Sequence, residues 1–281
     1  MSQLIFYNAW FCPYAQRVWC TLNELGVPHE IVEALHVDPI TQEYVKEACL
    51  LAVNPDGLVP TLVETREVLS EGEGEERSGG KRQIMCGSLN ILRTMYQRHA
   101  KNGGEQENER LSFFSDHAEA FDRKICSPFY RVLMRRDGEE RVQAWKDVMS
   151  GLTSFCDRLE WRTEDGPSNE KEISFYAAEV GSEGHERDRP SQVDFAVFPW
   201  VYRLYIIEHF KGLRLPERTE EEVALKRKLT AWQQKMESLP SVHRTLADSD
   251  ELTKLYNRYA DGTAKSKVGD AVRKGKEAHS V

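Results

Sequence analysis

The stretch LIFYNAWFCPYA, residues 4–15, decides the fold. Its first four residues are apolar, which is typical of a buried strand. Pro13 suits the first position of a helix, because its missing N–H would have no partner there. Apolar residues then recur at helical spacing as far as Gly26, which ends the pattern. The sequence therefore predicts a strand that passes into a helix at Cys12.

Cys12 is the candidate nucleophile, because it would lie at the positive end of that helix. Such a position lowers the pKa of a thiol from about 8.5 toward 3.5–7.5, so we expect a resting thiolate. The alternative is a small buried hydrophobic side chain, the usual role of a free cysteine. A dithiol motif would carry a second cysteine where this chain has Ala15. We therefore expect monothiol chemistry, in which an external thiol releases the product.

Length and composition limit the class of protein. The chain has 281 residues and a net charge of −8, with acidic and basic residues interspersed. The length predicts one or two domains, and the charge gives no indication of nucleic-acid binding. No apolar stretch approaches the ~20 residues of a membrane span. The amino terminus has no charged-then-apolar leader. We therefore predict a cytoplasmic protein with reduced cysteines and with neither nucleic-acid nor membrane partners.

Residues 1–100 alternate between strand-like and helix-like segments. The turn signal Asn54–Gly57 precedes a strand-like run in which Val59-Pro60 is a candidate cis peptide bond. Segment 71–82 is rich in Gly, Glu and Ser and predicts a flexible insertion. Ser88 suits the cap of the following helix. The expected elements after the first helix are strand 29–34, helix 42–53, strand 58–63, strand 83–86 and helix 89–98.

Strand-like patterning nearly disappears after residue 105, and helical periodicity predicts an all-helical domain over 105–260. Within it, Ser191 and Asp194 have the spacing of a capping box ahead of an apolar helix. Segment 164–189 is polar and Gly-rich and predicts an irregular surface insertion. The lysine-rich segment 261–281 predicts a disordered tail. No cysteines or histidines have metal-ligand spacing, so we predict no metal site.

A βαβ unit followed by a ββα unit, with a proline at the entry of the third strand, is the layout of a thioredoxin-like domain. Together with an all-helical second half, it resembles the cytosolic glutathione transferases, and within them the omega class with its cysteine-type active site. The predicted fold class is thus a thioredoxin-like domain followed by an all-helical domain. The matching motifs are Phe11–Ala15, Asn54–Pro60, Ser88 and Ser191–Arg203.

The resemblance implies that glutathione is the co-substrate and that Cys12 forms a mixed disulfide with it. The Val59 backbone, next to Pro60, would pair with the cysteinyl part of glutathione like an added strand. Ser88 and the N–H groups at its helix start would receive the γ-glutamyl carboxylate. Lys46 is a candidate for binding the glycine carboxylate. The complete predicted glutathione site consists of Tyr14, Lys46, Val59, Pro60, Gly87 and Ser88.

One position departs from the family pattern, because Gly87 stands where an acidic residue usually precedes the serine. Loss of a charge-assisted hydrogen bond costs about 1.5–3 kcal/mol, roughly ten- to hundredfold in affinity. The acceptor, a small electrophile or disulfide, would bind in a pocket lined from the second domain. The predicted pocket residues are Phe11, Tyr130, Arg131 and Trp200. The alternative for the aromatic side chains among them is a place in the core.

The leading functional hypothesis is a glutathione-dependent thiol transferase or reductase, acting by deglutathionylation or dehydroascorbate-type reduction. Two alternatives stay open. One is a conventional conjugating transferase, since Tyr7 lies near the usual tyrosine position and Cys12 would then be incidental. The other is a non-catalytic binding or regulatory module on the same fold, which Gly87 and the long loops favour. The resemblance also implies a homodimer.

Overall fold

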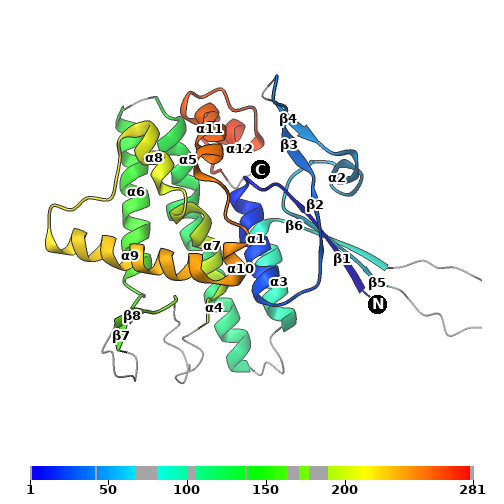
Figure 1. The fold of residues 1–281 in the computed structure, drawn as a ribbon, viewed down its shortest axis with the longest axis horizontal. Coiled ribbons are helices and arrows are strands. Elements are labelled where there is room, and N and C mark those ends of the chain that lie inside the picture. Colours follow the sequence, from blue (N-terminus) through cyan, green and yellow to red (C-terminus); the bar gives the residue numbers. More distant parts are fainter. Residues whose placement is uncertain are drawn as a thin grey trace, which may run out of the picture.

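The computed structural model describes residues 2–41, 43–66, 81–99, 105–136, 138–163, 171–176 and 189–278. A sheet-containing N-terminal half and a helical C-terminal half lie side by side (Figure 1). This arrangement confirms the predicted fold class. Nearly all of the insertion predicted at 71–82 lies outside the described residues. No helix in the described ranges has the length and hydropathy to cross a membrane.

The N-terminal half is built on a four-stranded sheet with the order β2-β1-β5-β6. Strand β1 (Ser2–Asn8) pairs in parallel with β2 (Glu30–Glu33) and antiparallel with β5 (Thr61–Arg66). Strand β5 also pairs antiparallel with β6 (Lys81–Cys86). Successive side chains of β1 face opposite sides of the sheet, so Phe6 joins the main core while its neighbour joins a smaller cluster on the other face.

Helices cover both faces of this sheet. On the face toward the second half, α1 (Pro13–Glu24) packs against α3 (Ser88–His99). On the opposite face, α2 (Ala48–Val53) contributes to the smaller cluster. Strands β3 (Leu35–Val37) and β4 (Tyr44–Lys46) form a separate hairpin beside α2 (Figure 1).

The helix predicted over 42–53 is correct only at its C-terminal end, because the first part forms β4. The Asp38 carboxylate accepts hydrogen bonds from the N–H groups of Ile40 and Thr41 at 2.8 and 2.6 Å. Such a local turn gives the backbone an alternative to a helix and directs the following residues back along β3. Strand pairing therefore overrides the helical pattern at Tyr44–Lys46.

The C-terminal half consists of helices and one small hairpin. Its first long helix is continuous but contains a π-helical turn, η1 (Asp122–Cys126), between α4 (Glu105–Phe121) and α5 (Ser127–Met134). The remaining elements are α6 (Gly138–Cys156), β7 (Trp161–Thr163), β8 (Lys171–Ile173), α7 (Gln192–Val201), α8 (Leu204–Lys211), α9 (Glu220–Ser238), α10 (Pro240–His243), α11 (Ser249–Ala260) and α12 (Lys267–Arg273).

Helix α7 is the centre of this half, and all ten of its residues are buried. Ser191 caps it, and the predicted capping box with Asp194 is confirmed. The buried Asp194 carboxylate accepts hydrogen bonds from the Ser191 N–H at 2.7 Å, the Tyr176 N–H at 2.9 Å and the Trp232 Nε1–H at 2.8 Å. One carboxylate therefore joins α7 to α9 and to the segment after β8.

That segment belongs to the insertion predicted at 164–189. Of its described residues, 171–176 and 189, the stretch 171–176 is not an irregular surface loop. It forms β8, which pairs with β7, and buries Phe175 and Tyr176. Phe175 and Tyr176 thus pack this segment against the core, although most of the predicted insertion is polar.

The disordered tail predicted over 261–281 is wrong for its described part. Residues 267–273 form α12, whose N-cap Ser266 accepts a hydrogen bond from the Gly269 N–H at 2.9 Å. Val272 is buried in the core, and the buried Ala278 N–H donates to the Ser127 hydroxyl at 2.7 Å. A few apolar side chains on one face suffice to fix this short helix against α5.

Candidate functional site

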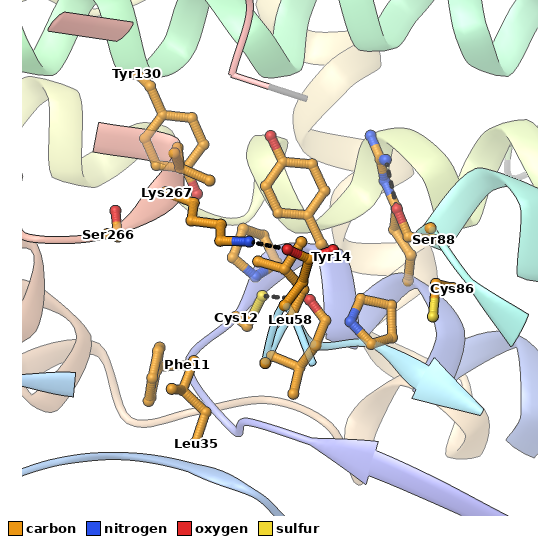
Figure 2. Close-up of a pocket in the computed structure, with 18 of the residues that line it drawn as sticks. Phe11, Cys12, Tyr14, Leu35, Leu58, Cys86, Ser88, Tyr130, Ser266 and Lys267 are labelled. Atoms are coloured by element: carbon orange, nitrogen blue, oxygen red, sulfur yellow. Dashed lines mark hydrogen bonds and ion pairs between the residues drawn. The ribbon is translucent and has the colours of Figure 1, made fainter. Parts of the chain in front are cut away.

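A cavity of about 630 Å³ lies between the two halves (Figure 2). Its walls come from the start of α1, the loop before β5, the start of α3 and helices α5, α11 and α12. The structure therefore brings together segments that are far apart in the sequence. The predicted site residues that line this cavity are Phe11, Cys12, Tyr14, Lys46, Val59, Pro60, Gly87, Ser88 and Tyr130.

Cys12 is the N-cap of α1, with Pro13 in the first turn, as the sequence predicts. Its Sγ lies 4.0 Å from the Val59 carbonyl oxygen, and both residues line the cavity (Figure 2). The Val59-Pro60 peptide bond is cis, which confirms the prediction for this bond. The thiol thus faces an extended backbone segment, and its side chain is half-buried.

Burial raises the pKa of the Cys12 thiol above its ordinary value. The N–H groups of Ala15 and Tyr14 act in the opposite direction, as do the positive charges of Arg203 and Arg17, but burial has the larger effect. The direction of this shift is opposite to the one predicted from the helix end, and it favours the protonated thiol over the thiolate. The sequence indicates the helix end but not how deeply the second half covers it.

Arg17, one turn further along α1, is a buried residue that sequence reasoning missed. Its guanidinium donates to the Ala196 carbonyl oxygen at 2.8 Å and to the Ser88 hydroxyl at 3.1 Å. It also forms an ion pair with Asp122 of η1 and lies 4.1 Å from the Trp200 ring centroid. The available signal was an arginine on the apolar face of a predicted helix.

The Ser88 end of the cavity combines a hydroxyl, backbone N–H groups and acidic side chains. Gly87 has a φ of +82°, a conformation that glycine adopts without strain. Glu119 and Asp122 line the cavity at this end, and both come from the second half. Glu119 and Asp122 thus bring acidic side chains to the site, where position 87 has none. The sequence pattern did not indicate either residue.

Lys46 lies at another edge of the same cavity. Its Nζ donates to the Asp56 carbonyl oxygen at 2.7 Å. Its stem crosses Gly57, where a Cβ would lie 2.4 Å from the Lys46 Cδ and where φ is +60°. Burial lowers the pKa of Lys46, and the nearby charge of Lys267 lowers it further. A glycine in the predicted turn therefore makes room for this cation.

Aromatic rings form the apolar part of the cavity wall. The rings of Tyr14 and Tyr130 stack with centroids 6.4 Å apart, and Tyr259 lies 5.4 Å from Tyr130. The Tyr14 hydroxyl is buried and has no hydrogen-bond partner among the described residues. Tyr256 and Tyr259, both on α11, were not predicted, because a tyrosine at helical spacing is equally typical of a core.

Two residues predicted to line the acceptor pocket do not line it. Trp200 is fully buried on α7 and supports Tyr14 from behind, with ring centroids 4.9 Å apart. Arg131 forms an ion pair with Asp147 of α6, with 3.3 Å between nitrogen and oxygen. Neighbouring helical residues differ by about 100° in direction, so Arg131 and Tyr130 face different elements.

Tyr7, the alternative catalytic hydroxyl, does not line the cavity either. It packs with Leu50 and Val53 in the cluster on the opposite face of the sheet. All six cysteines are free. Within the described ranges, no group of three or more His, Cys, Asp or Glu side chains could hold a metal ion.

Comparison with known proteins identifies the N-terminal half. Residues 11–98 match the family model of the N-terminal domain of glutathione S-transferase. The match covers nearly all of the sheet-containing half. The resemblance to cytosolic glutathione transferases is thereby confirmed, and so is the predicted co-substrate, because glutathione is the co-substrate of this family.

The whole chain is similar to glutathione transferases of several classes. Glutathione S-transferase L1 of Arabidopsis thaliana is 22% identical over 258 residues, covering 90% of this chain and 86% of the relative. Glutathione transferase Omega 3C of Trametes versicolor has a TM-score of 0.61 at 23% identity, covering 92% and 90%. Rice GST1 in complex with glutathione has a TM-score of 0.62 at 20% identity, covering 91% and 95%. These structural likenesses establish the fold.

Proposed function

We propose that the protein is an omega-like glutathione transferase that transfers glutathionyl groups through a Cys12–glutathione mixed disulfide. The observation that best supports this is the position of Cys12. Its thiol lies at the start of α1, beside the Val59 carbonyl oxygen, in the cavity that Ser88 also lines. The reaction is deglutathionylation of a mixed disulfide or a related reduction, such as that of dehydroascorbate.

The proposed cycle has two thiol–disulfide exchanges. The Cys12 thiolate attacks the glutathionyl sulfur of a substrate mixed disulfide, so that a Cys12–glutathione bond forms and the substrate leaves as a thiolate that takes up a proton. A second glutathione, as thiolate, then attacks the glutathionyl sulfur and regenerates Cys12. The products are the substrate thiol and glutathione disulfide, whose two halves come from the substrate's glutathionyl group and from the free glutathione.

Deprotonation of Cys12 is the step that this site must assist, because burial favours the neutral thiol. The N–H groups at the start of α1 and the cations Arg17 and Arg203 stabilise the thiolate once it forms. Such groups act more strongly in a partly desolvated site than in water. Burial therefore raises the free energy of forming the thiolate, and it also strengthens the electrostatic interactions that stabilise the thiolate once it has formed.

The glutathione backbone fits the polar features of the cavity. The Val59 backbone is placed to pair with the cysteinyl part like an added strand. Ser88 and the N–H groups at the start of α3 suit the γ-glutamyl carboxylate. Glu119 would provide the negative charge for the γ-glutamyl ammonium that Gly87 cannot, because the Asp122 charge is compensated by Arg17. Lys46 remains the candidate for the glycine carboxylate.

The acceptor would bind against the tyrosine rings of α1, α5 and α11. A wall of stacked rings favours an apolar, flat acceptor, and the buried hydroxyl of Tyr14 offers it one hydrogen-bonding group. Glutathione transferase Omega 2S of Trametes versicolor, with a TM-score of 0.59 at 13% identity, has been solved in complex with 2,4-dihydroxybenzophenone. That complex supports an aromatic acceptor class for this cavity.

A second function, conjugation of glutathione to electrophiles, is favoured by the raised pKa of Cys12. A neutral thiol at this position can donate a hydrogen bond to the glutathione thiolate, as a hydroxyl does in other classes. In that mechanism Cys12 forms no covalent bond. A serine at position 12 would then preserve or increase the activity.

Cys12→Ser and Cys12→Ala distinguish the two reactions, and Cys86→Ser is the matched control. Cys86 also lines the cavity but lies at the end of β6. We expect transfer from a glutathionylated peptide to fall more than a hundredfold in both Cys12 variants and to be unchanged in Cys86→Ser. Intact mass after exposure to glutathione disulfide should show one added glutathione in the wild type, absent from Cys12→Ser. Full transfer activity in Cys12→Ala, or a wild-type protein that conjugates chlorodinitrobenzene efficiently but transfers no glutathionyl group, would contradict the proposal.

A cytoplasmic location and a homodimer complete the proposal. Both follow from the resemblance to the cytosolic family. Light scattering of the purified protein tests the dimer directly, because a monomeric mass at micromolar concentration contradicts it.

A further inference from the structure

The C-terminal segment carries a second cation to the edge of the cavity where Lys46 lies. Lys267, the first residue of α12, forms an ion pair with Asp56, with 2.6 Å between Nζ and Oδ1. Lys46 donates to the backbone carbonyl of the same Asp56. Figure 2 shows Lys267 extending from α12 into the region above Cys12 and Leu58. Two cations from opposite halves of the protein therefore meet at one turn.

We propose that Lys267 binds the glycine carboxylate of glutathione together with Lys46, and thereby makes the enzyme select the full tripeptide over γ-glutamylcysteine. This inference rests on the proposed glutathione site, in which the γ-glutamyl end lies at Ser88 and the sulfur at Cys12. The glycine end then points toward Lys46 and Asp56. Lys265 and Lys267 of the second half both line the cavity, and Lys267 is the one that pairs with Asp56.

The local charge balance explains why a second lysine is needed. Lys46 and Asp56 alone sum to zero, so an arriving carboxylate would leave one uncompensated negative charge. With Lys267 the three groups carry a net charge of +1, and a bound carboxylate brings the sum to zero. Charge-assisted hydrogen bonds to a carboxylate are among the stronger polar contacts in proteins.

The fold holds Lys267 at this place through contacts away from the ligand. Ser266 caps α12 and accepts a hydrogen bond from the Tyr259 hydroxyl at 2.9 Å. Ala278 binds the Ser127 hydroxyl in the core. Lys265 pairs with Glu43, 2.5 Å apart, outside the Asp56 turn. The neighbouring carboxylate of Asp270 is paired with Arg273. The segment is therefore positioned before any ligand arrives.

Calorimetry with reduced glutathione and with γ-glutamylcysteine tests the inference. We expect Lys267→Met to weaken glutathione about three- to tenfold, because the pair is partly exposed to solvent, and to change γ-glutamylcysteine less than twofold. Lys267→Arg should restore most of the affinity for glutathione. Lys274→Met is the matched control: this exposed lysine caps the other end of α12, and its loss should leave both affinities unchanged.

The outcomes separate this inference from the proposed reaction. Equal weakening of both ligands by Lys267→Met would show that the lysine only supports the fold, and no weakening would show that it does not bind the carboxylate; either result overturns the inference. A wild-type protein that binds glutathione but transfers no glutathionyl group contradicts the reaction alone. A wild-type protein that binds neither ligand contradicts both.

Discussion

The buried ion pair between Arg17 and Asp122 gives the sharpest prediction for stability. The Arg17 side chain is 1% exposed and the Asp122 side chain 4%. Replacing Arg17 by Met removes the cation opposite a buried carboxylate, together with the hydrogen bonds to Ala196 and Ser88. Breaking a buried pair on one side costs about 3–5 kcal/mol of unfolding free energy, because the remaining charge stays desolvated.

The double variant Arg17→Met/Asp122→Leu removes both charges. Because a buried pair can often be replaced by apolar side chains at little cost, we expect it to lose less than the two single variants together. The coupling free energy should exceed about 2 kcal/mol, which is typical of residues in one network. Arg131→Met is the control, since its half-exposed pair with Asp147 should contribute about 1 kcal/mol or less.

Urea unfolding followed by tryptophan fluorescence measures these differences, and equal m-values across the variants allow their free energies to be compared. Arg17 donates a hydrogen bond to Ser88, which lines the cavity between the halves. Glutathione affinity should therefore fall in Arg17→Met as well. Single variants whose costs simply add, or an Arg17→Met variant no less stable than Arg131→Met, would refute the conclusion that Arg17 and Asp122 form a buried, coupled ion pair between the two halves.

Two further predictions concern Asp194 and Cys12. Asp194→Ala leaves several buried donors without an acceptor, and it should lower the free energy of unfolding in urea by about 3 kcal/mol or more. Asp248→Ala, at the exposed cap of α11, should cost about 1 kcal/mol. Similar losses in the two variants would contradict this prediction. Because the pKa of Cys12 is raised, its rate of alkylation by iodoacetamide should increase with pH, with the midpoint of the increase above 9. Peptide mass spectrometry measures this rate, and the exposed Cys49 is the accessibility reference. A midpoint below 8 would contradict the structure.

The parts of this protein that the sequence could predict are those with local signals. Pro13 after an apolar run indicates the junction between β1 and α1, and Asn54–Gly57 indicates the turn before β5. The Ser191 pattern indicates the start of α7. In each case, neighbouring residues alone define the backbone, whereas the assignment of Cys12, Val59 and Ser88 to one site came from the resemblance to glutathione transferases.

Features that depend on distant contacts could not be predicted in this way. Arg17 and Asp122 are 105 positions apart, and no periodicity links them. The segment 261–278 has the composition of a tail, yet a few apolar contacts and a cap fix it against α5. Sequence patterns describe which face of an element is apolar but not which element covers it.

Cys12 illustrates how these two kinds of information combine. The local pattern correctly places the thiol at a helix N-terminus, where N–H groups and the dipole favour a thiolate. Tertiary packing then adds a desolvation cost that exceeds this effect. Since Tyr130 and α11 supply part of that cover, any acceptor or glutathione molecule that fills the cavity also changes the solvation of the thiol. We therefore expect the alkylation rate of Cys12 to respond to bound glutathione.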